Sequence, residues 1–173
     1  MKKVILSVAV FAIASLSATA QKEAASDKQL KFSVGVEAGL PIGDAKEGYS
    51  FGIGGSAQAE YAAAENVALT LNAGYITLLG KTIEEEKVPS LKLIPVLAGA
   101  KFFFNEKVYG HAQLGMTFAS VKVAGISAST SAFTYAPGIG VQAAENFDVE
   151  LKYQAYSKGG TTSFIGLRAA YTF

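Results

Sequence analysis

Hydrophobic and polar residues alternate along most of the chain after residue 30. The alternation is clearest over 147–155, where five apolar residues share one face and Asp148, Glu150, Lys152 and Gln154 share the other. A period of two is that of a β-strand whose two faces meet different environments. The pattern predicts eight strands, at about 32–40, 49–61, 67–75, 91–104, 108–118, 133–143, 147–155 and 165–173.

The connections between these predicted strands alternate in length. The long ones are 41–48, 76–90, 119–131 and 157–162, and the short ones are 62–66, 105–107 and 144–146. Long outer loops and tight periplasmic turns are typical of membrane β-barrels. We therefore predict an all-β fold over residues 31–173, an eight-stranded antiparallel up-and-down transmembrane β-barrel with both termini in the periplasm.

A soluble barrel also alternates, but it places its apolar residues inside. Here the polar face is rich in Gly, Ser, Thr and Gln with isolated charges, which suits a narrow lumen better than a water-facing surface. Aromatic residues also gather near the strand ends. One group comprises Phe32, Tyr61, Phe104, Phe147, Tyr171 and Phe173, and the other comprises Tyr49, Tyr75, Phe118, Phe133 and Tyr153. Two aromatic girdles favour the membrane barrel over the soluble one.

The N-terminus has the pattern of a secretory signal peptide. Two lysines follow Met1, residues 4–16 are mostly apolar, and Ala18-Thr19-Ala20 precedes Gln21. We predict a signal peptide over residues 1–20 that is cut between Ala20 and Gln21, with an uncleaved membrane anchor as the alternative. Residues 21–30 are then a polar periplasmic leader.

Composition removes several classes of function. The chain has 15 basic and 14 acidic residues, so no overall charge indicates a nucleic-acid partner. It has no cysteine, which excludes thiol chemistry and disulfides. Half of the residues are hydrophobic, yet no apolar run after residue 20 approaches the roughly 18 residues of a membrane helix.

The charges expected in the lumen form the main candidate site. Glu37 and Arg168 fall at similar heights on the first and last strands, which must pair to close a barrel, and Glu150 and Lys152 lie beside them. Opposite charges in so narrow an interior should pair, because an unpaired buried charge is costly. We predict a network that closes the lumen, with Lys101 and two further acidic residues, Glu60 and Asp148, nearer the periplasm. The alternative is a gated or leaky conduit.

Other candidate residues have simpler interpretations. The single histidine, His111, has no nucleophile or acid at a recognisable spacing, so we interpret it as a hydrogen-bonding residue of the lumen and expect no enzymatic activity. The acidic run 84–86 could bind divalent cations, but a solvated outer loop is the favoured interpretation. No cofactor or metal is expected.

Three features carry a resemblance to a known family: the C-terminal Tyr171-Thr172-Phe173, the strand with Gly138-Ile139-Gly140-Val141, and the Ala20-Gln21 junction. The chain resembles the small eight-stranded outer-membrane barrels of Gram-negative bacteria, of the outer-membrane protein A and X type and the porin-like barrels of Bacteroidetes. The resemblance implies contact with outer-membrane lipid and lipopolysaccharide. It also implies that Tyr171 and Phe173 form a signal read by the barrel-assembly machinery.

The same family includes adhesins, stability factors and small or closed pores. We therefore expect a structural or surface-interaction role, with an extracellular ligand bound through loops 76–90 and 119–131. The alternative is a small porin-like pore for ions or small solutes.

Overall fold

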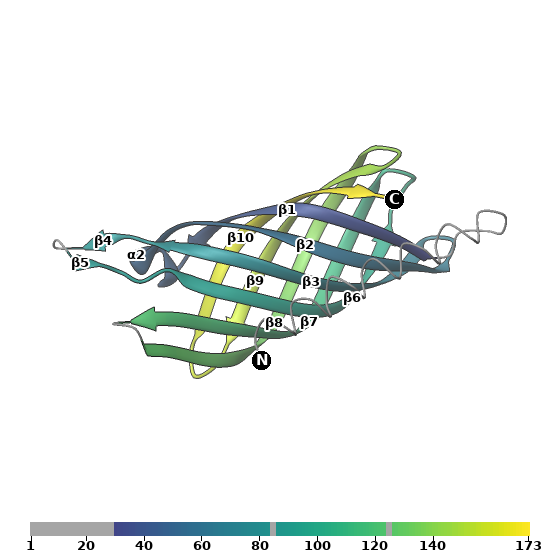
Figure 1. Ribbon diagram of the computed structural model, residues 1–173. Coiled ribbons are helices and arrows are strands. Elements are labelled where there is room, and N and C mark those ends of the chain that lie inside the picture. The colour runs from purple at the N-terminus through teal and green to yellow at the C-terminus, as the bar shows by residue number, and fades with distance from the viewer. Residues whose placement is uncertain (1–29, 84–85, 124–125) are drawn as a thin grey trace.

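The computed structural model describes residues 30–83, 86–123 and 126–173, and these form a closed antiparallel barrel (Figure 1). Its strands, in order around the wall, are β1 (Leu30–Ile42), β10 (Thr161–Thr172), β9 (Phe147–Ser157), β8 (Ile126–Ala144), β7 (Val108–Val123), β6 (Leu91–Phe103), β3 (Val67–Gly80) and β2 (Tyr49–Ala64). The predicted fold class, an eight-stranded up-and-down barrel, is confirmed. None of the helices in the described ranges is long and apolar enough to cross a membrane.

The first and last strands close the barrel, as predicted. β1 pairs with β2 on one side and with β10 on the other, and the Phe173 N–H donates to the Phe32 carbonyl at 2.9 Å. Following the cross-strand partners once around the wall from Ile42 leads back to Phe32, ten residues along the same strand. Such a stagger tilts the strands, and eight of them enclose only enough space for side chains.

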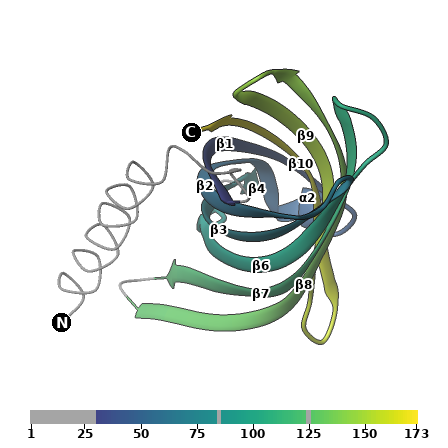
Figure 2. The same cartoon turned by 90° about the vertical axis from the view of Figure 1, so that its right-hand side faces the viewer.

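The two ends of the barrel differ. The turn end carries the short connections 65–66, 104–107 and 145–146. The loop end carries the helix α2 (Ala45–Gly48), the small sheet of β4 (Thr82–Ile83) and β5 (Glu86–Lys87), the end of β7 at Val123, the start of β8 at Ile126 and residues 158–160. In Figure 1 the loop end lies at the left, and Figure 2 looks into the barrel from the turn end.

The wall is apolar outside and mostly polar inside. Outward side chains such as Val36, Leu71 and Ile139 are more than half exposed, and aromatic residues such as Phe104 and Phe173 are exposed near the turn end. An apolar surface that encircles a protein is unstable in water and marks contact with lipid. In the strand predicted over 91–104, Lys101 faces the lumen as expected and is 5% exposed.

Two of the four predicted long loops, 76–90 and 119–131, are largely wrong, because the strands continue through them. In the region predicted as loop 119–131, β7 and β8 stay paired from Phe118 and Ser131 as far as Val123 and Ile126. Within 76–90, β3 runs on to Gly80 and the sheet of β4 and β5 follows. Beyond the lipid both faces of a strand meet water, so these extensions have no hydrophobic alternation by which the sequence could reveal them.

One aromatic residue predicted to face lipid turns inward. The register of β2 against β3 shifts between Tyr49 and Phe51, the mark of a β-bulge. A bulge adds one residue and so reverses the direction of the side chains beyond it. Tyr49 therefore packs, partly buried, against apolar side chains in the lumen.

Candidate functional site in the barrel lumen

Four of the predicted lumen charges lie on three adjacent strands, β1, β10 and β9. Glu37 of β1 is the direct cross-strand partner of Arg168 of β10, and Arg168 is in turn the partner of Glu150 of β9. Lys152 follows two residues later on the same face of β9. All four side chains point into the lumen and are at most 3% exposed. The register thus brings together the four residues that strand alternation had grouped.

The closest contacts among these charges differ from the predicted pairing of Glu37 with Arg168 across the first and last strands. Lys152 Nζ lies 2.9 Å from Glu37 Oε2, whereas Arg168 Nε lies 4.0 Å from Glu37 Oε1. Arg168 Nε donates to Ser56 Oγ at 3.0 Å, and Arg168 Nη2 donates to Ser33 Oγ at 2.9 Å. Lys152 is therefore the close partner of Glu37, and Arg168 is held mainly by two serine hydroxyls.

Arg168 also lies near a second carboxylate. Arg168 Nη1 is 3.7 Å from Asp148 Oδ1, and the same oxygen accepts a 2.6 Å hydrogen bond from the Tyr109 hydroxyl. Sequence alternation placed Asp148 in the lumen, but it identified neither Tyr109 as the partner of Asp148 nor the two serines as the partners of Arg168. Arg168 thus lies between two carboxylates, one on each neighbouring strand.

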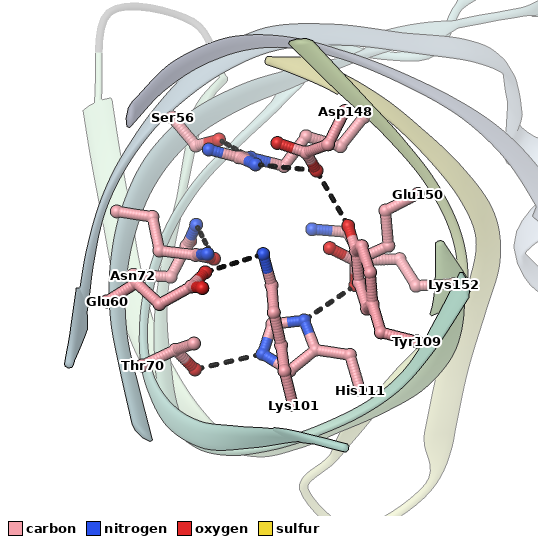
Figure 3. Close-up of polar contacts among 12 residues, drawn as sticks. Ser56, Glu60, Thr70, Asn72, Lys101, Tyr109, His111, Asp148, Glu150 and Lys152 are labelled. Carbon is pink, nitrogen blue, oxygen red and sulfur yellow. Dashed lines mark hydrogen bonds and ion pairs between the residues drawn. The ribbon is translucent and has the colours of Figure 1, made fainter. Parts of the chain in front are cut away.

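His111 connects opposite walls of the barrel (Figure 3). Its Nδ1 lies 2.9 Å from Glu150 Oε1 on β9, and its Nε2 lies 2.9 Å from Thr70 Oγ1 on β3. A carboxylate can only accept, so Nδ1 carries a proton. The Thr70 hydroxyl can then either donate to Nε2 or accept from it. The geometry places His111 as a hydrogen-bonding residue of the lumen, which was its favoured interpretation.

Lys101 lies toward the turn end, beside Glu60. Its Nζ is 2.7 Å from Glu60 Oε2 and 4.4 Å from the centre of the Tyr109 ring (Figure 3). Tyr109 lies against β8 at Gly140, where an added Cβ would overlap its ring. Glycine is therefore needed there for the ring to reach Asp148 across the lumen.

The buried charges nearly balance. Among the described residues, the lumen holds four carboxylates, of which Glu60 is only partly buried, against three permanent cations, and His111 lies beside the remaining carboxylate. The acidic residues are Glu37, Glu60, Asp148 and Glu150, and the basic ones are Lys101, Lys152 and Arg168. We call these seven residues and His111 the charge network. Breaking one of its fully buried pairs would leave an uncompensated charge, which is strongly destabilising.

A cavity opens at the turn end, between the charge network and the mouth of the barrel. It has a volume of about 740 Å³. Lys31, Glu60, Lys101, Tyr109 and Asp148 line it, together with residues of the turns 65–66 and 105–106. The part of the charge network nearest this mouth is therefore next to solvent. We call this space the turn-end cavity.

The loop-end half of the lumen contains an apolar cluster that sequence reasoning did not single out. The cluster comprises Ile76, Leu78, Leu93, Tyr156 and Phe164, each at most 6% exposed. The rings of Tyr156 and Phe164 lie 5.5 Å apart. The signal that could have revealed it was the loss of alternation near residues 91–97, where both faces of the strand are apolar.

The remaining predicted sites lie elsewhere. Tyr171 and Phe173 are exposed on the outer wall at the turn end, with their ring centres 5.4 Å apart. Ala20 and Gln21 fall outside the described residues, as does most of the acidic run 84–86, so the signal peptide, its cleavage and the leader stay predictions. Within residues 30–83, 86–123 and 126–173, no three His, Asp or Glu side chains are placed to hold a metal ion.

Comparison with known proteins agrees with this architecture. Residues 9–173 match the model of a family described as the outer membrane protein beta-barrel domain. No curated protein is detectably similar to the chain.

Several solved structures share the fold. Ail, the attachment invasion locus protein of Yersinia pestis, superposes with a TM-score of 0.59 at 21% identity, over 83% of this chain and 97% of Ail. Neisserial surface protein A superposes with a TM-score of 0.60 at 16% identity, over 83% of this chain and 96% of that one. The N-terminal barrel domain of Pseudomonas aeruginosa OprF superposes with a TM-score of 0.51 at 17% identity, over 82% of this chain and 97% of that domain.

Proposed function

The chain belongs to the outer membrane protein beta-barrel domain family, and from this we propose that it is an outer-membrane barrel with a closed lumen and a structural or surface-interaction role. The observation that carries the proposal is the pairing of the buried charges. Lys152 and Glu37 meet at 2.9 Å with at most 3% exposure, and Arg168 is wholly buried between two carboxylates. Buried charges that are paired across strands in this way favour an interior filled by side chains over an open channel.

We propose that the turn end faces the periplasm and the loop end faces outward. Short periplasmic turns and longer outer extensions are the usual arrangement in this class of barrel. The apolar wall then contacts lipid and lipopolysaccharide. In the same orientation Tyr171 and Phe173 lie at the periplasmic rim, where the barrel-assembly machinery would read them.

The loop end supplies the surface for interactions. β8 pairs with β9 only from Phe133 onward, so in the described structure the segment 126–132 is paired on one side alone. Exposed lysines, including Lys46, Lys81 and Lys158, lie at the same end. Ail has been solved in complex with the heparin analogue sucrose octasulfate. We propose that the loop end of this chain binds a surface ligand, and heparin is a suitable first probe.

Two measurements test the proposal. The purified barrel in a planar lipid bilayer should show no channel openings, and it should be retained on immobilised heparin. Shortening the β7–β8 hairpin by removing 120–129 should reduce retention without changing the shift in gel mobility on heating that marks a folded barrel. Steady channel openings would contradict the closed lumen. Retention that is unchanged by the deletion would contradict the assignment of the binding surface.

A small pore for ions is the second candidate. The turn-end cavity favours this pore, because the cavity brings solvent to Lys101 and Asp148. Conductance that falls when charges lining this cavity are neutralised would support the pore.

A further inference from the structure

The charge network and the apolar cluster both obstruct the lumen, but they resist water differently. Water can replace hydrogen bonds among polar side chains at little cost, whereas it gains no partners among apolar ones. A constriction lined by apolar side chains excludes water and ions by dewetting. The barrier to permeation should therefore depend on chemistry as well as on packing.

Polar atoms in the middle of the lumen retain unused bonding capacity. Within the described ranges, neither amide atom of Gln113 has a hydrogen-bond partner, nor do Gln58 Nε2 and Gln154 Oε1, although these residues are at most 3% exposed. They come from three different strands, β7, β2 and β9. Buried amides of this kind are normally satisfied by water. Continuing from the turn-end cavity, the lining thus stays compatible with water up to this level.

The apolar cluster offers water few such partners, since its one polar side-chain atom, the Tyr156 hydroxyl, already accepts a hydrogen bond from Gln154 Nε2 at 2.9 Å. The cluster also packs closely against the wall. A Cβ added at Gly39 would lie 3.1 Å from the Phe164 ring, and one added at Gly52 would lie 2.7 Å from Leu78 Cδ2. The backbone itself therefore meets these side chains, so no water fits between them and the wall at these two positions. Tyr49 and Leu91 pack against the cluster from its rim.

We propose that the apolar cluster, and not the charge network, is the barrier to water, protons and small ions. The lumen below it is a blind compartment that small solutes enter from the turn end and cannot leave at the loop end. This assignment rests on the closed barrel proposed above. It gives the two halves separate roles, because the charge network holds the strands together while the apolar cluster makes the protein impermeable.

The test compares proton flux into lipid vesicles that contain the full-length mature barrel and a trapped pH-sensitive dye. One variant opens the cluster, Leu78→Ala with Phe164→Ala, and a second removes the central ion pair, Glu37→Gln with Lys152→Met. The matched control, Leu79→Ala with Ile165→Ala, truncates apolar side chains at the neighbouring outward positions. Each variant is first shown to be folded by its heat-shifted gel mobility, and Leu93→Ala replaces the double cluster variant if that one fails to fold.

We expect flux to rise about tenfold or more when the cluster is opened, because the dry constriction is lost. The ion-pair variant and the control should stay close to the wild-type rate. An ion-pair variant that leaks while the cluster variant stays tight would overturn the assignment, and so would two tight variants. A wild-type barrel that leaks as fast as the cluster variant would instead contradict the closed lumen itself, so the two failures can be told apart.

Discussion

In the half of the lumen nearer the turn end most inward side chains are charged or polar, whereas near the loop end an aliphatic and aromatic cluster packs, with only a few polar neighbours such as Thr134 and Gln154. The outer wall shows no such change, since apolar side chains such as Leu69 near the turn end and Leu40 near the loop end are both exposed. The first half is held by directional contacts such as Lys152 to Glu37 at 2.9 Å, and the second by the close packing of Phe164 and its neighbours. One strand pattern thus supports two kinds of interior.

The difference indicates how each half should respond to substitution. A buried charge that loses its partner keeps its desolvation penalty, so the damage is large and depends on chemistry. An apolar side chain that is truncated leaves a cavity, so the damage depends on volume. Substitutions can therefore test whether the two halves are stabilised in these separate ways.

Arg168→Ala should give the largest effect, a loss of about 3 to 5 kcal/mol in the free energy of unfolding. It removes the cation that lies 3.7 Å from Asp148 and 4.0 Å from Glu37. Urea unfolding of the barrel in lipid vesicles, followed by tyrosine fluorescence, would measure it. Combining Arg168→Met with Asp148→Asn should restore part of the loss, because one stranded charge is then removed as well. A loss below about 1 kcal/mol for Arg168→Ala would contradict a stabilising charge network.

Phe164→Ala should cost about 3 kcal/mol, since it opens a cavity in the apolar cluster. The adjacent Ile165→Ala removes an outward side chain, where lipid can fill the space, so its cost should be below about 1 kcal/mol. The same unfolding assay compares the two variants. Equal losses would mean that Phe164 is not packed in a dry interior.

Strand alternation was enough to predict which face of each strand meets lipid and which meets the lumen. Glu37, Glu150, Lys152 and Arg168 were grouped correctly because a period of two and a closed order of strands leave few other arrangements. Their exact partners could not be predicted, because the tilt of the strands sets the position of each side chain along the barrel axis. Lys152 therefore takes the position beside Glu37 that the sequence had suggested for Arg168.

The loop end was predicted less well than the charge network, and for a different reason. Alternation arises where one face is in lipid, so it ended at Phe118 although β7 continues to Val123. The apolar cluster was missed because its members come from β3, β6, β9 and β10, and each looks like an isolated exception on its own strand. Only the closed barrel brings Leu78 and Phe164 into one cluster.

Gly140→Ala should destabilise the barrel by about 1 to 3 kcal/mol, because the added methyl displaces the Tyr109 ring. The displacement would also break the hydrogen bond from Tyr109 to Asp148. Gly160→Ala is the matched control, since nothing lies within 4 Å of a Cβ there. The midpoints of urea unfolding distinguish the two variants. Equal midpoints would show that the Tyr109 position is not fixed by β8.

Lys101→Met should have the smallest effect, about 1 kcal/mol or less, although it too removes a lysine from the charge network. Its partner Glu60 has a side chain that is 19% exposed and lies on the turn-end cavity, so water can solvate the carboxylate left behind. Glu37, at 3%, has no such access when Lys152→Met removes its partner, and that variant should lose about 3 kcal/mol. Unfolding at two salt concentrations would separate them further, because screening reaches the exposed pair first. Equal losses would place the boundary of dry interior at the mouth of the barrel and remove the distinction between a hydrated turn end and a dry loop end.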